Sequence, residues 1–365
     1  MSEEQVHLVD AGELRRFCAA VFDRLGLAAD DAAQAAAVLV AADVRGIPSH
    51  GVGRLWRYVN GLRSGLMLPR VREETLAETA TSLAVNARGG MGAPVSVRTM
   101  RRVIEKATVS GSAFASVRDS NHFGIAGYYA MMALAHDMIG IAMTNTAALG
   151  VPTFGRVAMF GTNPIAFAAP AKEERAFVLD MSTTVVTRGK IEVYDKTGEP
   201  LPLGWAVDKT GKSAADARMM LDDMQERRGG GILPLGGAGE EFGGYKGYGL
   251  AVMVDILCAA LSGGPLGLGV FDTPSSSARV SHFFGAIKVG GFRPPDAFRA
   301  DMDRMLSDLR RCPPAVGEER VYFAGQKEFE HEQAVEREGV PLIEPVYRSL
   351  GKVAGEFGMK APAAG

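Results

Sequence analysis

The sequence predicts a mixed α/β protein, in which a mixed sheet is flanked by helices and helical parts lie at both ends of the chain. Short apolar runs of strand length recur through the middle of the chain and alternate there with helical patterns. No GxGxxG motif follows any of these runs, so the ordinary doubly wound dinucleotide-binding fold is not supported. We expect a helical part over residues 1–72, an α/β domain over 73–295, and a second helical part over 296–365 that packs back on the first.

The individual elements follow from the spacing of apolar residues. A helical period predicts helices over residues 10–26, 30–45, 94–108, 125–136, 250–261, 296–311, 328–339 and 343–357. Compact apolar runs predict strands over residues 82–86, 112–117, 138–146, 161–170, 177–180 and 283–289. The polar segment 213–230 is expected to be a flexible surface excursion, and the tail 359–365 is expected to be disordered.

The composition is that of a soluble globular protein. Of the 365 residues, 47% are hydrophobic and 22% are charged, the net charge is −2, and no basic block suggests a nucleic-acid partner. Cys18, Cys258 and Cys312 are too widely spaced for a metal motif, so we expect no metal and reduced thiols in a cytoplasmic protein. The acidic N-terminus lacks a signal-peptide core, and the longest apolar run, Tyr248–Ser262, contains Asp255 and is too short to span a membrane.

The segment IPSHGVGRLWRY combines side chains suited to a small acid. Pro48 and Ser49 stand where a helix would begin, and His50, Arg54 and Tyr58 then follow at a spacing of four residues, which places them on one helix face. An arginine offers a planar fork of donors that matches a carboxylate. The pattern therefore suggests a site for a hydroxy or oxo acid, although a solvated helix face explains the same spacing equally well.

His122 lies where an expected strand gives way to a helix. The strand over residues 112–117 is followed by a polar turn and then by the sequence His122-Phe123-Gly124. Such a loop lies at the end of a sheet, where ligands commonly bind, and histidine can both take and give a proton near neutral pH. The alternative is a packing histidine. His282, which precedes another strand, ranks below His50 and His122 as a site residue.

Three further strands end in polar groups that are expected to converge at one edge of the sheet. These are Met138–Thr146, Gly161–Pro170 and Phe177–Asp180. Asp180 and Ser182 are suited to bind ribose hydroxyls or an amide, while the alternative is that Asp180 caps a helix that begins directly after it.

A glycine-rich stretch, GGAGEEFGGYKGYGL, carries Lys246 into an apolar helix. Exposed backbone N–H groups, a helix N-terminus and an ammonium are typical of a phosphate cradle. The stretch does not match GxxxxGK[ST], so a nucleoside triphosphatase is not supported, and a glycine hinge is the alternative.

Five motifs together resemble the malate/L-lactate dehydrogenase family, which is distinct from the Rossmann-type dehydrogenases. They are SHGVGRLWRY, NHFGIAGYYA, GTNPIAFAAP, LDMSTTVVTRGK and GGYKGYGLA, and they occur in family order within residues 10–330. The family also includes sulfolactate, ureidoglycolate and diketogulonate dehydrogenases and piperideine-2-carboxylate reductase. The resemblance implies an atypical, non-Rossmann nicotinamide-binding fold, NAD or NADP as cofactor, and a homodimer. The N-terminal part would then carry the substrate side and the middle domain would bind the cofactor.

The resemblance also implies roles for particular residues. His122 is a candidate acid/base and His50 is the other, Arg54 would hold the substrate carboxylate, and Ser49 and Tyr58 would line the pocket. The positions where the family holds its cofactor are Thr146, Asp180, Met181, Ser182, Lys246, Gly325, Gln326 and Glu328. The family often has PGE where this chain has Ala324-Gly325-Gln326.

The expected reaction is hydride transfer between a nicotinamide and a small 2-hydroxy or 2-oxo acid such as malate, lactate or sulfolactate. A second possibility keeps the fold and reduces a cyclic imine carboxylate such as piperideine-2-carboxylate. A third, from another class, is a cofactor-independent lyase or isomerase. The expected partner is a small carboxylate, with neither a nucleic acid nor a membrane involved.

Overall fold

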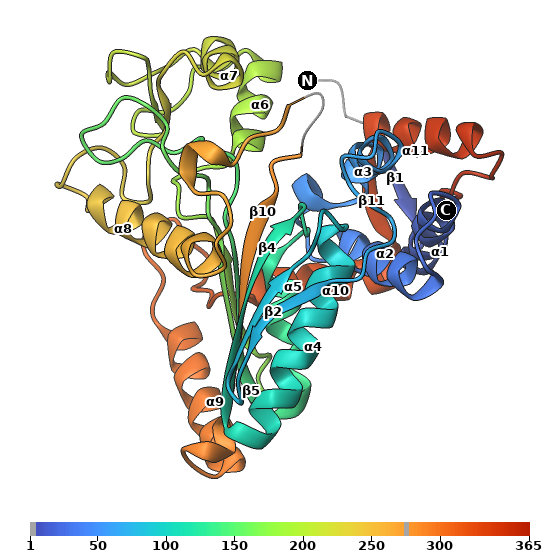
Figure 1. Ribbon diagram of the computed structural model, residues 1–365. Coiled ribbons are helices and arrows are strands. Elements are labelled where there is room, and N and C mark those ends of the chain that lie inside the picture. Colours follow the sequence, from blue (N-terminus) through green and yellow to red (C-terminus); the bar gives the residue numbers. More distant parts are fainter. Residues whose placement is uncertain (1–4, 274–276) are drawn as a thin grey trace.

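The computed structural model describes residues 5–273 and 277–365, and it confirms the predicted mixed α/β class (Figure 1). Its main sheet has seven strands in the order β2-β3-β4-β10-β5-β6-β7. They are β2 (Glu74–Glu78), β3 (Ser82–Asn86), β4 (Ser112–Ser120), β10 (Val280–Lys288), β5 (Met138–Thr144), β6 (Ile165–Ala169) and β7 (Phe177–Met181). Only β3 and β4 pair in parallel, and every other neighbouring pair in this sheet is antiparallel.

Helices cover both faces of this sheet. On one face lie α4 (Gly92–Ser110) and α5 (Ala126–Met132), and on the other lie α8 (Gly244–Asp255) and its continuation as a π-helix over Ile256–Ala260 (Figure 1). Successive strand residues alternate between the two layers, since Phe284 packs in the core of the α4 side whereas Phe283 packs with Val254 and Cys258. α9 (Pro295–Arg311) packs beside β6 and β7 through Met302 and Leu306.

The two ends of the chain pack together, as expected. The N-terminal part comprises β1 (Val6–Val9), α1 (Ala11–Arg24), α2 (Ala29–Val44) and α3 (Leu55–Arg63), and the C-terminal part comprises α10 (Gln326–Glu338), β11 (Val340–Ile343) and α11 (Glu344–Glu356). β1 and β11 form an antiparallel pair. The tail is ordered as well, because Tyr347 donates a hydrogen bond to the Pro362 carbonyl (3.0 Å) and Ala364 bridges to Val9. The prediction of a disordered tail is therefore wrong.

The segment expected to be a flexible excursion is also ordered. It forms α7 (Ala217–Glu226), which packs against α6 (Arg188–Thr197) beside the short pair β8 (Ala206–Val207) and β9 (Gly231–Ile232). Met220, Leu221 and Met224 are buried in a separate small core with Ile191. The polar residues of the segment face outward and conceal this apolar stripe, which is why the composition was misleading. None of the helices that the structure describes is both long and apolar enough to cross a membrane.

Candidate active site

The segment that carries His50 and Arg54 does not form the single helix that its spacing predicts. Two short 3-10 turns, Pro48–His50 and Val52–Arg54, precede α3. Gly51 separates them in an extended conformation, with φ −86° and ψ −158°. A Cβ on Gly51 would lie 1.9 Å from Oδ1 of the buried Asp43, whose Oδ2 accepts a hydrogen bond from Val52 N (2.7 Å). The Asp43 contact thus requires glycine here and fixes the break.

This break directs the polar groups of the segment into one cavity of about 460 Å³. Its lining includes Ser49, His50, Arg54, Arg57, His122, Thr146 and Arg188. Arg54 is held by a hydrogen bond from its Nε to the Ser49 carbonyl (2.7 Å), and Ser49 Oγ lies 2.9 Å from His50 Nδ1. His50 and Arg54, which come from different turns, therefore reach the same space without sharing a helix face.

His122 enters the cavity from the loop that follows β4. Its ring stacks on that of His50 with centroids 5.5 Å apart and an interplanar angle of 20°. Burial, with the charges of His50, Arg57 and Arg54, lowers the pKa of His122 well below its ordinary value. Burial and the two arginines lower the pKa of His50 to about 4. Both imidazoles are consequently neutral at pH 7, the form that accepts a proton.

Tyr58 supports His122 from behind and is not among the residues that line the cavity. Its hydroxyl lies 2.6 Å from His122 Nδ1, and the side chain is only 3% exposed. Burial raises the pKa of Tyr58 to about 12, so the hydroxyl remains neutral and can either accept a hydrogen bond from Nδ1–H or donate one to Nδ1, which also lies 3.4 Å from Gly124 N. In the tautomer that carries the proton on Nδ1, the lone pair of Nε2 is available as a base. The structure thus places Tyr58 behind His122, as a support for that imidazole.

His282 lies in β10, beneath the cavity, and is fully buried. Its ring nitrogens lie 2.8 Å from Thr144 Oγ1 and 2.8 Å from Ser120 Oγ, and its ring stacks on Phe123 at 4.5 Å. It therefore ties together the strand ends that carry His122 and Thr146. It belongs to the framework of the site, in agreement with its lower rank in the sequence.

The carboxyl ends of β5 and β7 meet at one edge of the sheet, and the start of β6, which is antiparallel to both, lies between them. Met143 pairs with Ile165, which in turn pairs with Met181. Beyond these strands, Thr146 N donates to Asn163 Oδ1 (3.1 Å) and its side chain lines the cavity. The edge is thus continuous with the cavity that contains the histidines.

Asp180 does not cap the helix that follows it. The next helix, α6, begins only at Arg188, and Asp180 Oδ2 instead accepts a hydrogen bond from Gly127 N (2.7 Å) in the first turn of α5. The sequence alternative of a helix starting after Asp180 is therefore wrong. Ser182 Oγ is engaged with the Thr184 carbonyl (3.0 Å).

The other candidate cofactor residues are not part of the cavity lining. Gly325 has φ +92° and packs so closely on β7 that a Cβ would lie 2.9 Å from the Val178 side chain, which places the Gly325–Glu328 turn beside the strand. Lys246 is exposed in the first turn of α8. Leu235 connects that turn to β7, because it packs against Gly247 and its N–H donates to Thr183 O (2.9 Å).

Arg57 is a cavity residue that the sequence did not single out, and Arg188, one of the two basic residues that follow Asp180 in the chain, lines the cavity as well. Arg57 follows Arg54 by three residues and lies on the same side of α3, so the spacing of the two arginines was the available signal. Arg188 starts α6, and its Nε donates to Glu192 Oε1 (3.1 Å). Among the residues that the structure describes, no cluster of His, Cys, Asp and Glu is arranged to hold a metal ion.

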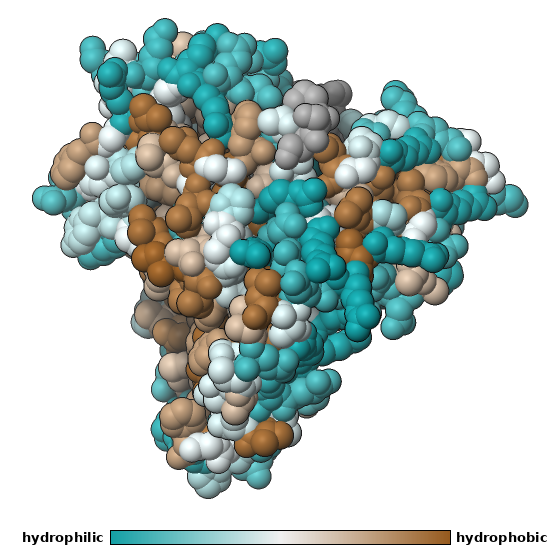
Figure 2. All heavy atoms as spheres, in the orientation of Figure 1, coloured by the Kyte–Doolittle hydropathy of each residue, from teal (hydrophilic) through white to brown (hydrophobic). Residues whose placement is uncertain are grey.

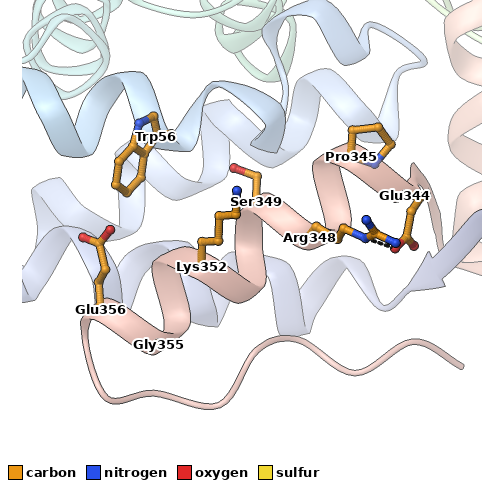
Figure 3. Close-up of a pocket in the computed structure, with 8 residues that line it drawn as sticks. All are labelled: Trp56, Glu344, Pro345, Arg348, Ser349, Lys352, Gly355 and Glu356. Carbon is orange, nitrogen blue, oxygen red and sulfur yellow. Dashed lines mark hydrogen bonds and ion pairs between the residues drawn. The ribbon is translucent and has the colours of Figure 1, made fainter.

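A separate pocket of about 870 Å³ lies between Trp56 of α3 and the outer side of α11 (Figure 3). Its polar side chains, such as Lys352 and Glu356, come from α11, and Arg348 pairs there with Glu344. It shares no lining residue with the cavity and contains no histidine. The cavity, which contains His50 and His122, is therefore the stronger candidate for catalysis.

Comparisons with known proteins agree with the geometry. The family model described as malate/L-lactate dehydrogenase matches residues 9–351. The malate dehydrogenase of Pyrococcus abyssi is 40% identical over 358 residues, which are 98% of this chain and 97% of that protein. The ureidoglycolate dehydrogenase (NAD(+)) of Escherichia coli K12 is 31% identical, with 89% of each chain covered.

Among solved structures, the malate dehydrogenase of Entamoeba histolytica superposes with a TM-score of 0.95 at 30% identity. The match covers 98% of this chain and 100% of that one. The predicted family and the predicted enzyme class, a dehydrogenase, are thereby confirmed. This chain belongs to the malate/L-lactate dehydrogenase family.

Proposed function

We propose that the cavity binds a small 2-hydroxy or 2-oxo acid such as malate, lactate or sulfolactate, and that hydride moves between C2 of this acid and a nicotinamide cofactor. The observation that carries the proposal is one cavity that combines a neutral histidine, His122, with a guanidinium, Arg54, and opens onto the polar edge of the sheet. A cofactor-independent lyase is disfavoured, since the relatives reported above are named dehydrogenases.

The donor set along the sheet edge fits a nicotinamide dinucleotide. Hydroxyls of Thr146 and Thr162 lie beside the cavity, where they suit a carboxamide or a ribose. Lys246 and the N-terminus of α8 supply positive charge of the kind that a diphosphate requires. The bound cofactor would accept hydride from C2 during oxidation and return it during reduction.

Asp180 and Glu328 bear on the choice between NAD and NADP. Burial is the largest cause of the raised pKa of Asp180, and the Glu328 carboxylate adds to it against the opposing charge of Arg45. Two acids disfavour a further phosphate and can accept hydrogen bonds from ribose hydroxyls, so the proposed cofactor is NAD.

Arg54 would fix the orientation of the substrate. No ion pair to its guanidinium occurs within residues 5–273 and 277–365, and only its Nε is bonded, to the Ser49 carbonyl. The remaining N–H groups can therefore hold the C1 carboxylate through paired hydrogen bonds. This contact would place C2 and its oxygen beside the stacked histidines.

His122 is the proposed acid/base. In oxidation the proton of the C2 hydroxyl passes to His122 Nε2, the C2–H electron pair leaves as hydride, and the C–O bond becomes a carbonyl. Tyr58 accepts the hydrogen bond from Nδ1–H and stabilises the imidazolium that forms. In reduction His122 returns the proton to the carbonyl oxygen. His50, stacked on His122, is the alternative base.

The pH dependence should reflect the lowered histidine pKa values. A base with an ordinary pKa of about 6.5 loses half its activity at that pH. Here kcat/KM for oxidation should stay constant as the pH falls through 6.5 and decline only well below it, because burial and the neighbouring arginines lower the pKa of His122. Reduction needs the protonated form, so its kcat/KM should rise over the same interval. Initial rates in both directions between pH 4.5 and about 8 test this.

Asp43 provides the control for that profile, since burial raises its pKa to about 7 and it lies under Gly51. Asp43→Asn keeps an oxygen acceptor for Val52 N and removes the carboxyl. An acidic limb near pH 6.5 that persists in Asp43→Asn would contradict a neutral, low-pKa base.

The test of the reaction itself is the absorbance of reduced nicotinamide. Purified protein is mixed with NADH or NADPH and with pyruvate, oxaloacetate, sulfopyruvate or piperideine-2-carboxylate. Turnover of a 2-oxo acid, faster with NADH, is the expected result. If only the cyclic imine is turned over, the reaction is imine reduction and not oxidation of a 2-hydroxy acid. Absence of both turnover and NADH fluorescence change on binding would overturn the proposal.

We further propose that the protein works as a homodimer in the cytoplasm. The outer face of α8 and its π-helical continuation exposes Met253, Ile256 and Leu261, and hydrophobic residues gather over this region in Figure 2. Contiguous apolar surface of this kind is uncommon on monomers and supports a subunit interface. The three free cysteines, two of them buried, suit a reducing compartment.

Ile256→Glu should therefore convert the dimer to a monomer, because Ile256 is 55% exposed on that face and a charge there would be desolvated in the interface. Sedimentation velocity measures the mass. The control is Val109→Glu, which changes an equally apolar residue that is 91% exposed on α4. A wild-type monomer, or an Ile256→Glu protein that remains dimeric, would remove this face from the proposal.

A further inference from the structure

Arg57 lies at the mouth of the cavity. Together with Arg54 and Asp272 it lines both the cavity and an adjoining open groove of about 880 Å³. Its side chain is 46% exposed, whereas the histidines lie deeper. A group that extends from the histidines toward solvent would therefore pass Arg57.

The two arginines are held differently although they are three residues apart. Arg54 is anchored through its Nε to the Ser49 carbonyl (2.7 Å). Arg57 pairs with Asp272 (3.3 Å), which is itself 52% exposed. A half-exposed ion pair contributes little because solvent screens it, so Asp272 can give way to another anion at low cost.

The Arg57 charge also reaches the reacting groups. Both His122 and His50 have their pKa lowered by Arg57 as well as by Arg54, so both guanidinium groups act within the cavity. Arg188, the remaining arginine of the lining, is engaged by Glu192 (3.1 Å) and by Gln225 (3.4 Å to each terminal nitrogen). After Arg54, Arg57 is thus better placed than Arg188 to bind an anionic group of a ligand.

We propose that Arg57 binds the distal anionic group of the substrate, so that the enzyme prefers dianionic 2-hydroxy and 2-oxo acids, bearing a second carboxylate or a sulfonate, over monoanionic ones. The inference rests on the proposed function. With C1 on Arg54 and C2 beside His122, the rest of the acid extends to the mouth, where Arg57 meets its far end. Lactate and pyruvate carry no group to fill that position.

The experiment compares kcat/KM for oxaloacetate, sulfopyruvate and pyruvate in wild type and Arg57→Gln. The variant should lose about 10- to 100-fold with both dianions, the range for removing a charged hydrogen-bond partner, and change less than about threefold with pyruvate. Arg57→Lys should recover part of the loss. A wild-type preference for sulfopyruvate over oxaloacetate would identify a sulfonate as the distal group, and the reverse would identify a carboxylate.

Two matched variants separate the effect from a general change of charge. Asp272→Asn frees Arg57 and should raise the ratio of dianion to pyruvate turnover. Arg102→Gln removes a cation of α4 that pairs with Glu78 (3.1 Å) and lines neither the cavity nor the adjoining groove, and it should leave the ratio unchanged. An equal loss for dianions and pyruvate in Arg57→Gln, or a wild type that prefers pyruvate, would overturn the proposal.

Calorimetric binding of malate and lactate keeps the inference testable if no turnover is found. Wild type should bind malate more tightly than lactate, and Arg57→Gln should bind the two alike. Absence of turnover with preserved malate selectivity would refute the reaction and retain the Arg57 site. Turnover without any effect of Arg57 on selectivity would refute the Arg57 site alone.

Discussion

His122→Asn should lower kcat for oxidation of the 2-hydroxy acid by about 10²- to 10⁴-fold, the usual contribution of a positioned general base. Asparagine is polar and of similar length but cannot take up a proton, so the Tyr58 contact is weakened without leaving a large void. The dissociation constant for NADH should change little. Steady-state rates measure the first effect and NADH fluorescence titration the second.

His50→Asn is the matched comparison, since His50 stacks on His122 and shares the cavity. The His50→Asn substitution should lower kcat much less than His122→Asn does. Tyr58→Phe, which removes only the hydroxyl at 2.6 Å from Nδ1, should reproduce part of the His122→Asn loss because the imidazolium loses its acceptor. If activity survives in His122→Asn and disappears in His50→Asn, the two histidines have exchanged roles.

Arg54→Gln should raise KM for the 2-oxo acid by about 100-fold, which corresponds to the roughly 3 kcal/mol of a charge-assisted pair of hydrogen bonds. Glutamine retains one donor and loses both the charge and the fork. The KM of Arg54→Lys should lie between those of the wild type and Arg54→Gln, because an ammonium keeps the charge without the planar geometry. KM is measured at saturating NADH.

NADH affinity is the internal control for this variant, because Arg54 is assigned to the substrate and the candidate cofactor residues other than Thr146 are not part of the cavity lining. An unchanged KM would exclude Arg54 from substrate binding. A parallel loss of NADH affinity would indicate a collapsed cavity and not a missing carboxylate contact.

Local sequence patterns were sufficient for the central part of the fold. The strand and helix around His122 and the meeting of β5, β6 and β7 follow from apolar runs, because buried strands need little outside information to be recognised. The motif resemblance gave the family for the same reason, since those motifs are contiguous in the chain.

The predictions failed where distant residues decide the local conformation. The spacing of His50, Arg54 and Tyr58 is helical, yet Asp43 reaches the backbone at Gly51 and Val52 and interrupts the helix. The periodicity of the sequence does not reveal such a contact. The position of Tyr58 behind His122 depends on this turn and could not be predicted from the spacing.

The pairing of β1 with β11 joins residues more than three hundred positions apart. The last elements of the chain therefore pack in the same unit as the first ones. Val346 of α11 packs against Gly53, in the turn that ends at Arg54. During synthesis that turn leaves the ribosome early and remains without its final packing partner until α11 follows. The turn that carries Arg54 thus gains its contact with α11 only after translation has passed residue 346, so a chain released before that point carries both histidines and lacks this contact.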